Sequence, residues 1–156
     1  MTTRTPFTAT ASTKYQKTDH DKMPKGWVAH GSRVSTQANI GTSETDIADA
    51  TETFSCVAGR RYLVLAKGRV NPDNDPMEII MRLYADGSQI DSHSWRTVVV
   101  SEDHNFTMWG VFDCSVSGAK IFKMTGQANT GSTTFDLNAS AITPAQLLVM
   151  DIGPTP

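Results

Sequence analysis

The densest group of possible ligand atoms in the sequence lies in the segment NPDNDPMEI, residues 71–79. Asp73, Asn74, Asp75 and Glu78 place side-chain oxygens close together there, and oxygen atoms are the ligands that Ca²⁺ requires. The segment lacks the ligand spacing and the glycine of an EF-hand loop. Its Asn-Pro and Asp-Pro steps are typical of an ordinary turn, in which Asx side chains bond the local backbone. We therefore expect a turn, with a calcium site at Asp73, Asp75 and Glu78 as the alternative.

A serine hydrolase site is the next chemistry that the residue types suggest. His93 lies between Ser92 and Ser94 and close to Asp91. Neighbours in a strand point to opposite faces, so both serines are expected to face away from His93. The sequence contains no G-x-S-x-G elbow and no phosphate-binding G-x-x-x-x-G-K motif. The four histidines also fit no metal-ligand spacing. We predict a protein that is not an enzyme and has no cofactor, although a carboxylate pair that meets only in space stays open.

Composition limits the other function classes. The chain has 156 residues and a formal net charge of -2, so it has no overall positive field to attract nucleic acid or an anionic membrane. No run approaches the length of a membrane-spanning helix, and no apolar signal region precedes the rest. Cys56 and Cys114 lie far apart without a CxxC motif, and we expect two buried reduced thiols. We expect one domain that is made in the cytoplasm and binds neither nucleic acid nor membrane.

The elements that carry these residues are predicted to be strands from Gly26 onward. Asp86-Gly87 is a strong hairpin signal between two of them. The segment 43–52 offers only Ile47 and small alanines for burial, so we expect a loop or short turn there. The other apolar runs are short and separated by turn residues, without a sustained helical period. The predicted strands are 26–34, 53–59, 60–70, 77–87, 88–100, 105–116, 119–128, 133–142 and 145–153.

Strands at this spacing indicate an all-β sandwich or barrel. We predict a jelly-roll-like antiparallel sandwich of about eight strands over residues 26–156. An immunoglobulin-like sandwich is the competing interpretation, but the chain lacks the Cys…Trp…Cys spacing that would favour it.

The N-terminal segment, residues 1–25, has a different composition. It contains six threonines before residue 14, few large apolar residues and no periodic pattern. A segment of this kind cannot bury enough surface to order itself. It is either a disordered terminus or an extended arm that orders on a neighbouring subunit, with Phe7, Tyr15 and Met23 as its anchors.

Two patterns indicate binding surfaces. Trp95, flanked by His93 and Arg96 in a polar strand, is expected to be the exposed tryptophan and, with His93, a possible glycan contact. The runs 61–66 and 145–150 are apolar on both faces of a strand, and burial against a second copy explains such a pattern. We expect an oligomer whose interface contains Leu63, Leu65, Leu147 and Val149.

Three segments resemble a family of small virion proteins, of minor-tail or head-decoration type, from tailed phages that infect actinobacteria. They are PKGWVAHG at 24–31, TFSCVAGRRYLVLAKGRV at 53–70, and FDLNASAITPAQLLVMDIGP at 135–154. The resemblance implies a jelly-roll-like β domain that forms trimers as a structural part of the virion. It brings no catalytic residues, and the middle strands over 77–128 depart from it.

The sequence thus predicts a non-enzymatic bacteriophage virion protein, assembled in the host cytoplasm. It would self-associate as a homotrimer and attach through residues 1–25 to the major capsid protein or to tail proteins. The favoured role is capsid decoration or cement. The alternative is a minor tail or tail-tip protein that binds host-surface carbohydrate. A small hydrolase or sugar-modifying enzyme on the same fold is a third class, with no motif in its favour.

Overall fold

The structure is a computed structural model that describes residues 24–73, 76–97, 102–129 and 133–156. The predicted arm with Phe7, Tyr15 and Met23, and the side chains of Asn74 and Asp75, lie outside the described residues. In the described part the chain forms ten strands: β1 (Gly26–Arg33), β2 (Gln37–Ile40), β3 (Thr45–Cys56), β4 (Arg60–Pro72), β5 (Met77–Ala85), β6 (Ser88–Thr97), β7 (His104–Cys114), β8 (Gly118–Ala128), β9 (Phe135–Leu137) and β10 (Ala145–Pro154). No helix among these residues is long and apolar enough to span a membrane.

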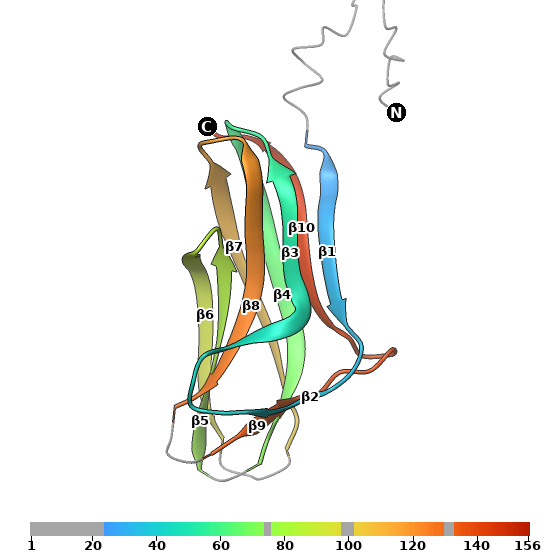
Figure 1. Cartoon of the computed structure of the whole chain (residues 1–156), viewed down its shortest axis with the longest axis vertical. Coiled ribbons are helices and arrows are strands. Elements are labelled where there is room, and N and C mark those ends of the chain that lie inside the picture. The colour runs from blue at the N-terminus through green and yellow to red at the C-terminus, as the bar shows by residue number, and fades with distance from the viewer. Residues whose placement is uncertain (1–23, 74–75, 98–101, 130–132) are drawn as a thin grey trace, which may run out of the picture.

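The strands form two antiparallel sheets packed face to face (Figure 1). One sheet has the order β1-β10-β4-β7, and the short strands β9 and β2 continue it beside the end of β4. The other has the order β3-β8-β5-β6. With β2 and β9 set aside, this is the 1-8-3-6 and 2-7-4-5 strand order of an eight-stranded jelly roll. The predicted fold class is therefore confirmed.

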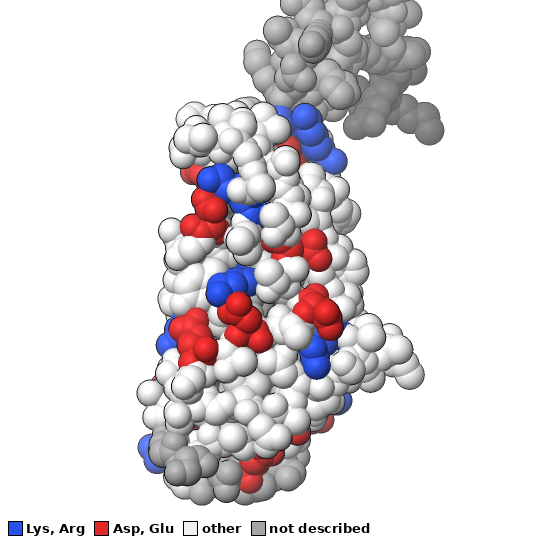
Figure 2. Space-filling view, viewed as in Figure 1, with Lys and Arg blue, Asp and Glu red and all other residues white. Residues whose placement is uncertain are grey.

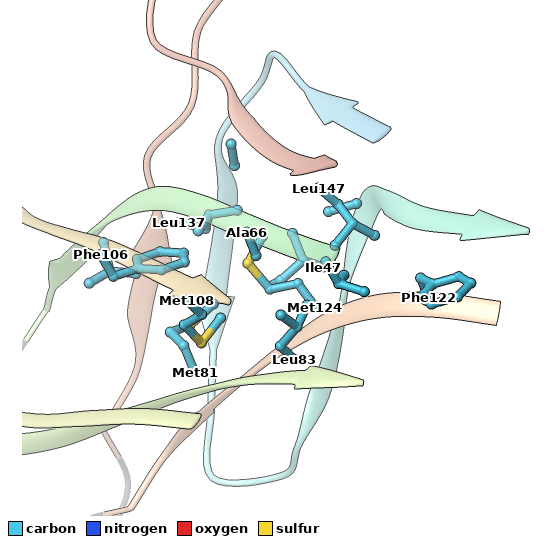
Figure 3. Packing of buried hydrophobic residues seen from close by; sticks show 14 of the residues in the cluster. Ile47, Ala66, Met81, Leu83, Phe106, Met108, Phe122, Met124, Leu137 and Leu147 are labelled. Carbon is cyan, nitrogen blue, oxygen red and sulfur yellow. The ribbon is translucent and has the colours of Figure 1, made fainter. Parts of the chain in front are cut away.

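Alternating apolar residues build the core between the sheets. In β4 and β10 the paired residues Val64 and Val149 face inward, as do Ala66 and Leu147. Every second residue of β5 does the same from the opposite sheet. Figure 3 shows these side chains from both sheets, among them Met81, pointing toward one another. In β4, β5 and β10 every second residue thus faces the core.

The hairpin expected at Asp86-Gly87 joins β5 and β6. Both residues have positive φ, 50° and 81°, as the mirror-image turns that suit strand twist require. Ala85 pairs with Ser88 across the turn. The prediction of a hairpin at this position is confirmed.

The expectation of a loop over 43–52 is wrong, because Thr45–Cys56 forms the single strand β3. The pairing of β3 with β8 shifts register between Asp46 and Thr51, and Asp49 has a φ of 58°. This bulge places Ile47 and Ala50, three residues apart, on the same buried face. The period of two is broken there, which is why the pattern was not recognisable as a strand. The last predicted strand before Pro144 is also shorter than expected, since only Phe135–Leu137 of 133–142 is paired.

A buried ion pair closes one end of the sandwich. The Arg60 guanidinium donates from Nε and Nη2 to the two carboxylate oxygens of Asp151, each at 2.5 Å. Asp151 Oδ1 also accepts from the backbone N–H of Gly153 at 3.0 Å. Both charged side chains are almost fully buried, so the opposite charges compensate each other away from water.

Candidate functional site

The outward face of the β1-β10-β4-β7 sheet carries two rows of apolar side chains. Directly paired residues of antiparallel strands point to the same face, so the register defines each row. One row runs across all four strands through Trp27, Met150, Leu63 and Val111. The second runs through His30, Leu148, Leu65 and Trp109. We refer to the seven apolar residues of these rows, without His30, as the apolar face.

Several members of the apolar face are strongly exposed. Trp27 is 59% exposed, Trp109 62% and Val111 40%, while the leucines and Met150 between them are half-buried. Single exposed apolar residues are ordinary, but a continuous set across four strands marks an interaction surface. The face is therefore the strongest candidate site for a binding partner.

The neighbouring charges do not disturb the apolar face. Next to Val111 along β7, Asp113 accepts two hydrogen bonds from Arg61, at 2.6 and 2.8 Å. The hydrogen bond from this guanidinium lowers the pKa of Asp113, so the pair stays ionised and mutually neutralised. At the opposite end the rows give way to Lys67, Thr107 and Gln146.

The position of Trp109 is fixed by its backbone. Trp109 lies on β7, at the edge of its sheet, and its N–H donates to Asp91 Oδ2 of β6 at 2.9 Å. The bond satisfies an edge donor and joins the two sheets at this side of the sandwich. The indole thus projects outward from a backbone that is held in place.

The outward face of the other sheet is different in kind. It carries ion pairs between Arg82 and Glu44 at 3.2 Å, and between Lys123 and Asp46 at 2.7 Å. Figure 2 shows charged side chains of both signs spread over this face. Mixed charge of this kind is typical of a solvated surface. The outward face of the β1-β10-β4-β7 sheet is therefore apolar where that of the other sheet is charged.

The predicted interface residues divide between the two sides of that sheet. Leu63 and Leu65 lie on the apolar face, and their role in an interface stays a prediction. Leu147 and Val149 are 0% exposed in the single chain and contact the core instead. Their assignment to an interface is corrected, because the second apolar side of β10 is covered by the chain's own second sheet.

Trp95 does not have the exposure expected of it. It is half-buried between the sheets, with its ring 5.0 Å from the His93 ring and 6.2 Å from the ring of Phe106, centroid to centroid. The His104 ring is also close, 6.4 Å from the indole, so three rings surround Trp95. The prediction of an exposed Trp95 is wrong, since β6 turns this residue inward opposite Ile79.

His93 and Trp95 nevertheless line a cavity of about 490 Å³ where β6 ends and β7 begins. Its other lining residues are Arg96, Asp103, His104 and Asn105. We call this cavity the β6–β7 pocket. Sequence reasoning missed Asp103 and His104 as members, because they follow a connection whose path the strand pattern does not define.

Asp103 is a fixed negative charge at the rim of the β6–β7 pocket. Its carboxylate accepts hydrogen bonds from the side-chain amides of Asn71, at 3.0 Å, and Asn138, at 2.9 Å. It also pairs with Arg69 at 3.0 Å. The Asn71 hydrogen bond is the main cause that lowers the pKa of Asp103, with Asn138 and Arg69 adding to it. The carboxylate is therefore ionised and already compensated.

The expected turn residues of 71–79 bind within the protein. Asp73 Oδ2 accepts from the Thr134 hydroxyl at 2.6 Å, and Glu78 Oε2 accepts from the Asn129 amide at 2.7 Å. Within the described ranges no group of three metal-ligating side chains comes together. The hydrogen bond between Asp73 and Thr134 joins the β4–β5 connection to the β8–β9 connection.

The two cysteines lie at the ends of β3 and β7. Both thiols are buried and free, as the sequence predicts. Burial, with the Cys114 thiol beside it, raises the pKa of Cys56 to about 12. The Cys56 thiol is therefore a poor nucleophile at neutral pH.

Comparison with known proteins gives distant likenesses among solved structures. No family model matches the chain, and no curated protein matches it. Among solved structures, one similar chain is the C-terminal domain of EclA, described as a sugar-binding protein, with 17% identity, coverage of 78% of this chain and 76% of that chain, and a TM-score of 0.43. Another is a chain in the structure of infectious bursal disease virus, Gx strain, with 12% identity and a TM-score of 0.30. That match covers 80% of this chain and 37% of the viral chain. Likenesses this weak carry no argument about function, which has to rest on the geometry of the chain itself.

Proposed function

We propose that this protein is a non-enzymatic structural component of a bacteriophage virion that self-associates as a homotrimer through its apolar face. In this proposal residues 1–25 attach the trimer to the particle, and the role is capsid decoration. The observation that carries the proposal is the apolar face, a continuous exposed surface on one side of a jelly roll whose other side is solvated. The resemblance of the sequence to phage virion proteins supports the location.

A second copy of the same chain is the occupant that fits the apolar face best. The seven residues of the apolar face carry no charge, and the neighbouring Arg61 and Asp113 neutralise each other. The two most exposed indoles lie on the outer strands, Trp27 on β1 and Trp109 on β7. In a closed ring, the β1 half of the apolar face of one copy would pack on the β7 half of the face of the next, which would cover both indoles and the residues between them.

The free energy of association depends on how much of the apolar face is covered. A tryptophan presents at most about 250 Å², so the exposed parts of the two indoles amount to roughly 300 Å² and stabilise contact by about 7 kcal/mol. Association itself costs roughly 4–15 kcal/mol. The gain from the two indoles lies within the range of this cost, and covering the leucines, Val111 and Met150 with them adds to it. A trimer that binds only the assembled particle would then stabilise it by mass action.

The test is the copy number of the protein in purified particles, measured by quantitative mass spectrometry against the major capsid protein. Trp109→Arg should lower this copy number, because the charge disrupts the trimer and leaves each copy to attach through a single arm. Ile121→Arg is the matched control, since Ile121 is a 49% exposed apolar residue on the outward face of the other sheet. Hundreds of copies are expected for wild type and for the control. Absence of the wild-type protein from the particle refutes the proposal.

A shortened chain tests the attachment. A variant that lacks residues 1–25 should keep the β domain and its self-association and lose its place on the particle. Retained attachment would move the particle contact to the sandwich itself.

The alternative role, a minor tail or tail-tip protein that binds host carbohydrate, is favoured by a separate observation. The β6–β7 pocket brings His93 and Trp95 together in a cavity large enough for a small ligand. A handful of copies per particle would favour this role over capsid decoration.

A further inference from the structure

The two cysteines meet inside the sandwich although they belong to different sheets. Cys56 is the last residue of β3, and Cys114 is the last residue of β7. Both face the core, where they are 2% and 1% exposed. The Cys56 thiol donates a hydrogen bond to the Cys114 sulfur, and the Cys114 thiol donates to the Val116 carbonyl at 3.2 Å. The two sulfur atoms are therefore in contact.

Backbone hydrogen bonds hold the two cysteines in this position. The β3–β4 connection follows Cys56, and the β7–β8 connection follows Cys114. The Gly59 N–H donates to the Cys114 carbonyl at 2.8 Å, and the Ala58 N–H donates to Ser117 Oγ at 2.8 Å. Each connection crosses from one sheet to the other, so these bonds join the two crossings at this end of the sandwich. The contact between the thiols is therefore set by two backbone segments that are bonded to each other.

Two thiols in contact are the reduced form of a disulfide. A disulfide between facing sheets is an established way to hold a β-sandwich together. The other common use of paired thiols is a structural zinc site, which takes four ligands. Within the part of the chain that the structure describes, no third metal-ligating side chain joins the two cysteines. The pair therefore favours a bond between its two sulfurs over a bound metal.

We propose that Cys56 and Cys114 form a reversible disulfide that joins the two sheets, with a low-molecular-weight disulfide as the oxidant. One protein thiolate attacks the oxidant, forms a mixed disulfide and releases one small thiol. The second protein thiolate then attacks the mixed disulfide, and the second small thiol leaves. The protein thus loses two protons and two electrons, and the oxidant is reduced to two thiols. The proposal does not depend on assembly through the apolar face or on attachment to a particle.

Burial determines when this reaction can take place. Exchange requires a thiolate, and burial raises the pKa of Cys56 to about 12 in the folded protein. The native pair therefore reacts slowly, and the bond forms while the chain folds or when this end of the sandwich opens. Once the bond has formed, the same burial shields it from small thiols.

The disulfide would fix the end of the sandwich at which β1 begins. The ends of β3 and β7 and the start of β1 lie at that end of the molecule (Figure 1). Cys114 is the register partner of Arg60. The Arg60 guanidinium binds Asp151, which is in turn the register partner of Gly26. A cross-link at Cys114 thus secures the strands beside the one that follows residues 1–25. A virion component leaves a reducing cytoplasm for the oxidising conditions in which disulfides persist.

The test is refolding of the reduced, full-length protein from urea in a mixture of reduced and oxidised glutathione, because both thiols are accessible while the chain folds. Free thiols are then alkylated in denaturant and the products are weighed by mass spectrometry. The expected product takes up no alkyl group and is lighter than the reduced chain by two hydrogen atoms. Digestion without a reductant should release a linked peptide that contains Cys56 and Cys114.

Thermal denaturation measures what the bond does to the fold. A disulfide between β3 and β7 closes a long loop and constrains the unfolded chain, so Tm should rise by about 8–16 °C over that of the reduced protein. Dithiothreitol added to the unfolded protein should return Tm to the reduced value on refolding.

Single-thiol variants are the matched controls. Cys114→Ser keeps a hydroxyl that can donate to the Val116 carbonyl and removes one of the two sulfurs. Its Tm should be the same after refolding with and without oxidised glutathione. Cys56→Ser serves the same comparison from the other side, and circular dichroism establishes that each variant is folded. The mass of the wild-type product tests the inference even where neither variant folds.

Several results would overturn the inference. One is a wild-type protein that keeps two alkylatable thiols after refolding in the oxidising mixture. Others are glutathione attached to either cysteine in place of an internal bond, chains linked to one another on a non-reducing gel, and an internal bond that leaves Tm unchanged. None of these results affects the proposed assembly through the apolar face, which is measured by the mass of the reduced protein.

Discussion

Replacement of Asp151 by asparagine should destabilise this fold far more than the same change at Asp113, whose ion pair lies at the surface. Arg60 and Asp151 form two charge-assisted hydrogen bonds of 2.5 Å, and their side chains are 6% and 2% exposed. The variant keeps the size of the side chain but removes the carboxylate charge that compensates the buried guanidinium. Loss of one partner from a buried pair costs about 3–5 kcal/mol, most of it the penalty of the remaining charge.

The size of the effect can be followed by thermal and urea denaturation at pH 7. For a domain of this length 1 kcal/mol corresponds to about 2–4 °C, so Tm should fall by roughly 6–20 °C. The matched control is Asp113→Asn, which breaks the exposed Arg61–Asp113 pair one row away with the same chemical change. Exposed pairs contribute little, so the control should remain close to wild type.

A double variant separates charge from shape. Arg60→Met with Asp151→Leu removes both charges together and should recover most of the stability lost in Asp151→Asn, because the buried cation is removed along with its counter-ion. A Tm for Asp151→Asn that equals that of Asp113→Asn would refute the assignment of this pair as a buried electrostatic contact.

Three further outcomes are expected. Cys56 and Cys114 should resist iodoacetamide in the native protein and react fully in denaturant, as read by mass spectrometry, because both thiols are buried and the pKa of Cys56 is raised to about 12. The folded-state pKa of Asp103 is lowered, so this carboxylate stabilises the fold above about pH 4 and loses that contribution as pH falls through the folded value. Asp103→Asn should therefore lower stability at pH 7, and its effect should shrink as the pH falls below about 4, in urea titrations at each pH. Gly126→Ala would place a Cβ 3.0 Å from a buried phenylalanine ring and should destabilise the core by about 1–3 kcal/mol, whereas Gly41→Ala, with nothing closer than 4.0 Å, should be tolerated in thermal denaturation.

Local patterns were sufficient for the fold class. The Asp86-Gly87 signal indicated a hairpin because both residues tolerate positive φ, and the alternation in 77–85 matches the inward face of β5. The prediction for 43–52 failed because the bulge at Asp49 breaks the period of two, and no local signal marks where a bulge occurs.

The candidate site was harder to predict, because exposure depends on which side of a strand meets the second sheet. The run 145–150 is apolar on both sides, so its sequence could not show that Leu147 is core and Leu148 surface. For Trp95 the polar neighbours suggested exposure, yet the pairing of β6 with β5 turns it inward. The partnership of Trp95 with His104 arises only when the two sheets meet at β6 and β7, which no spacing in the sequence encodes.

The most direct test of the central claim is the mass of the wild-type protein by sedimentation equilibrium over a range of concentrations. A chain of 17.0 kDa that associates through its apolar face should sediment as a species of three times that mass. Trp109→Arg should then sediment near 17.0 kDa, while Ile121→Arg keeps the wild-type mass. A wild-type protein that stays at the mass of one chain at every concentration would contradict assembly through this face.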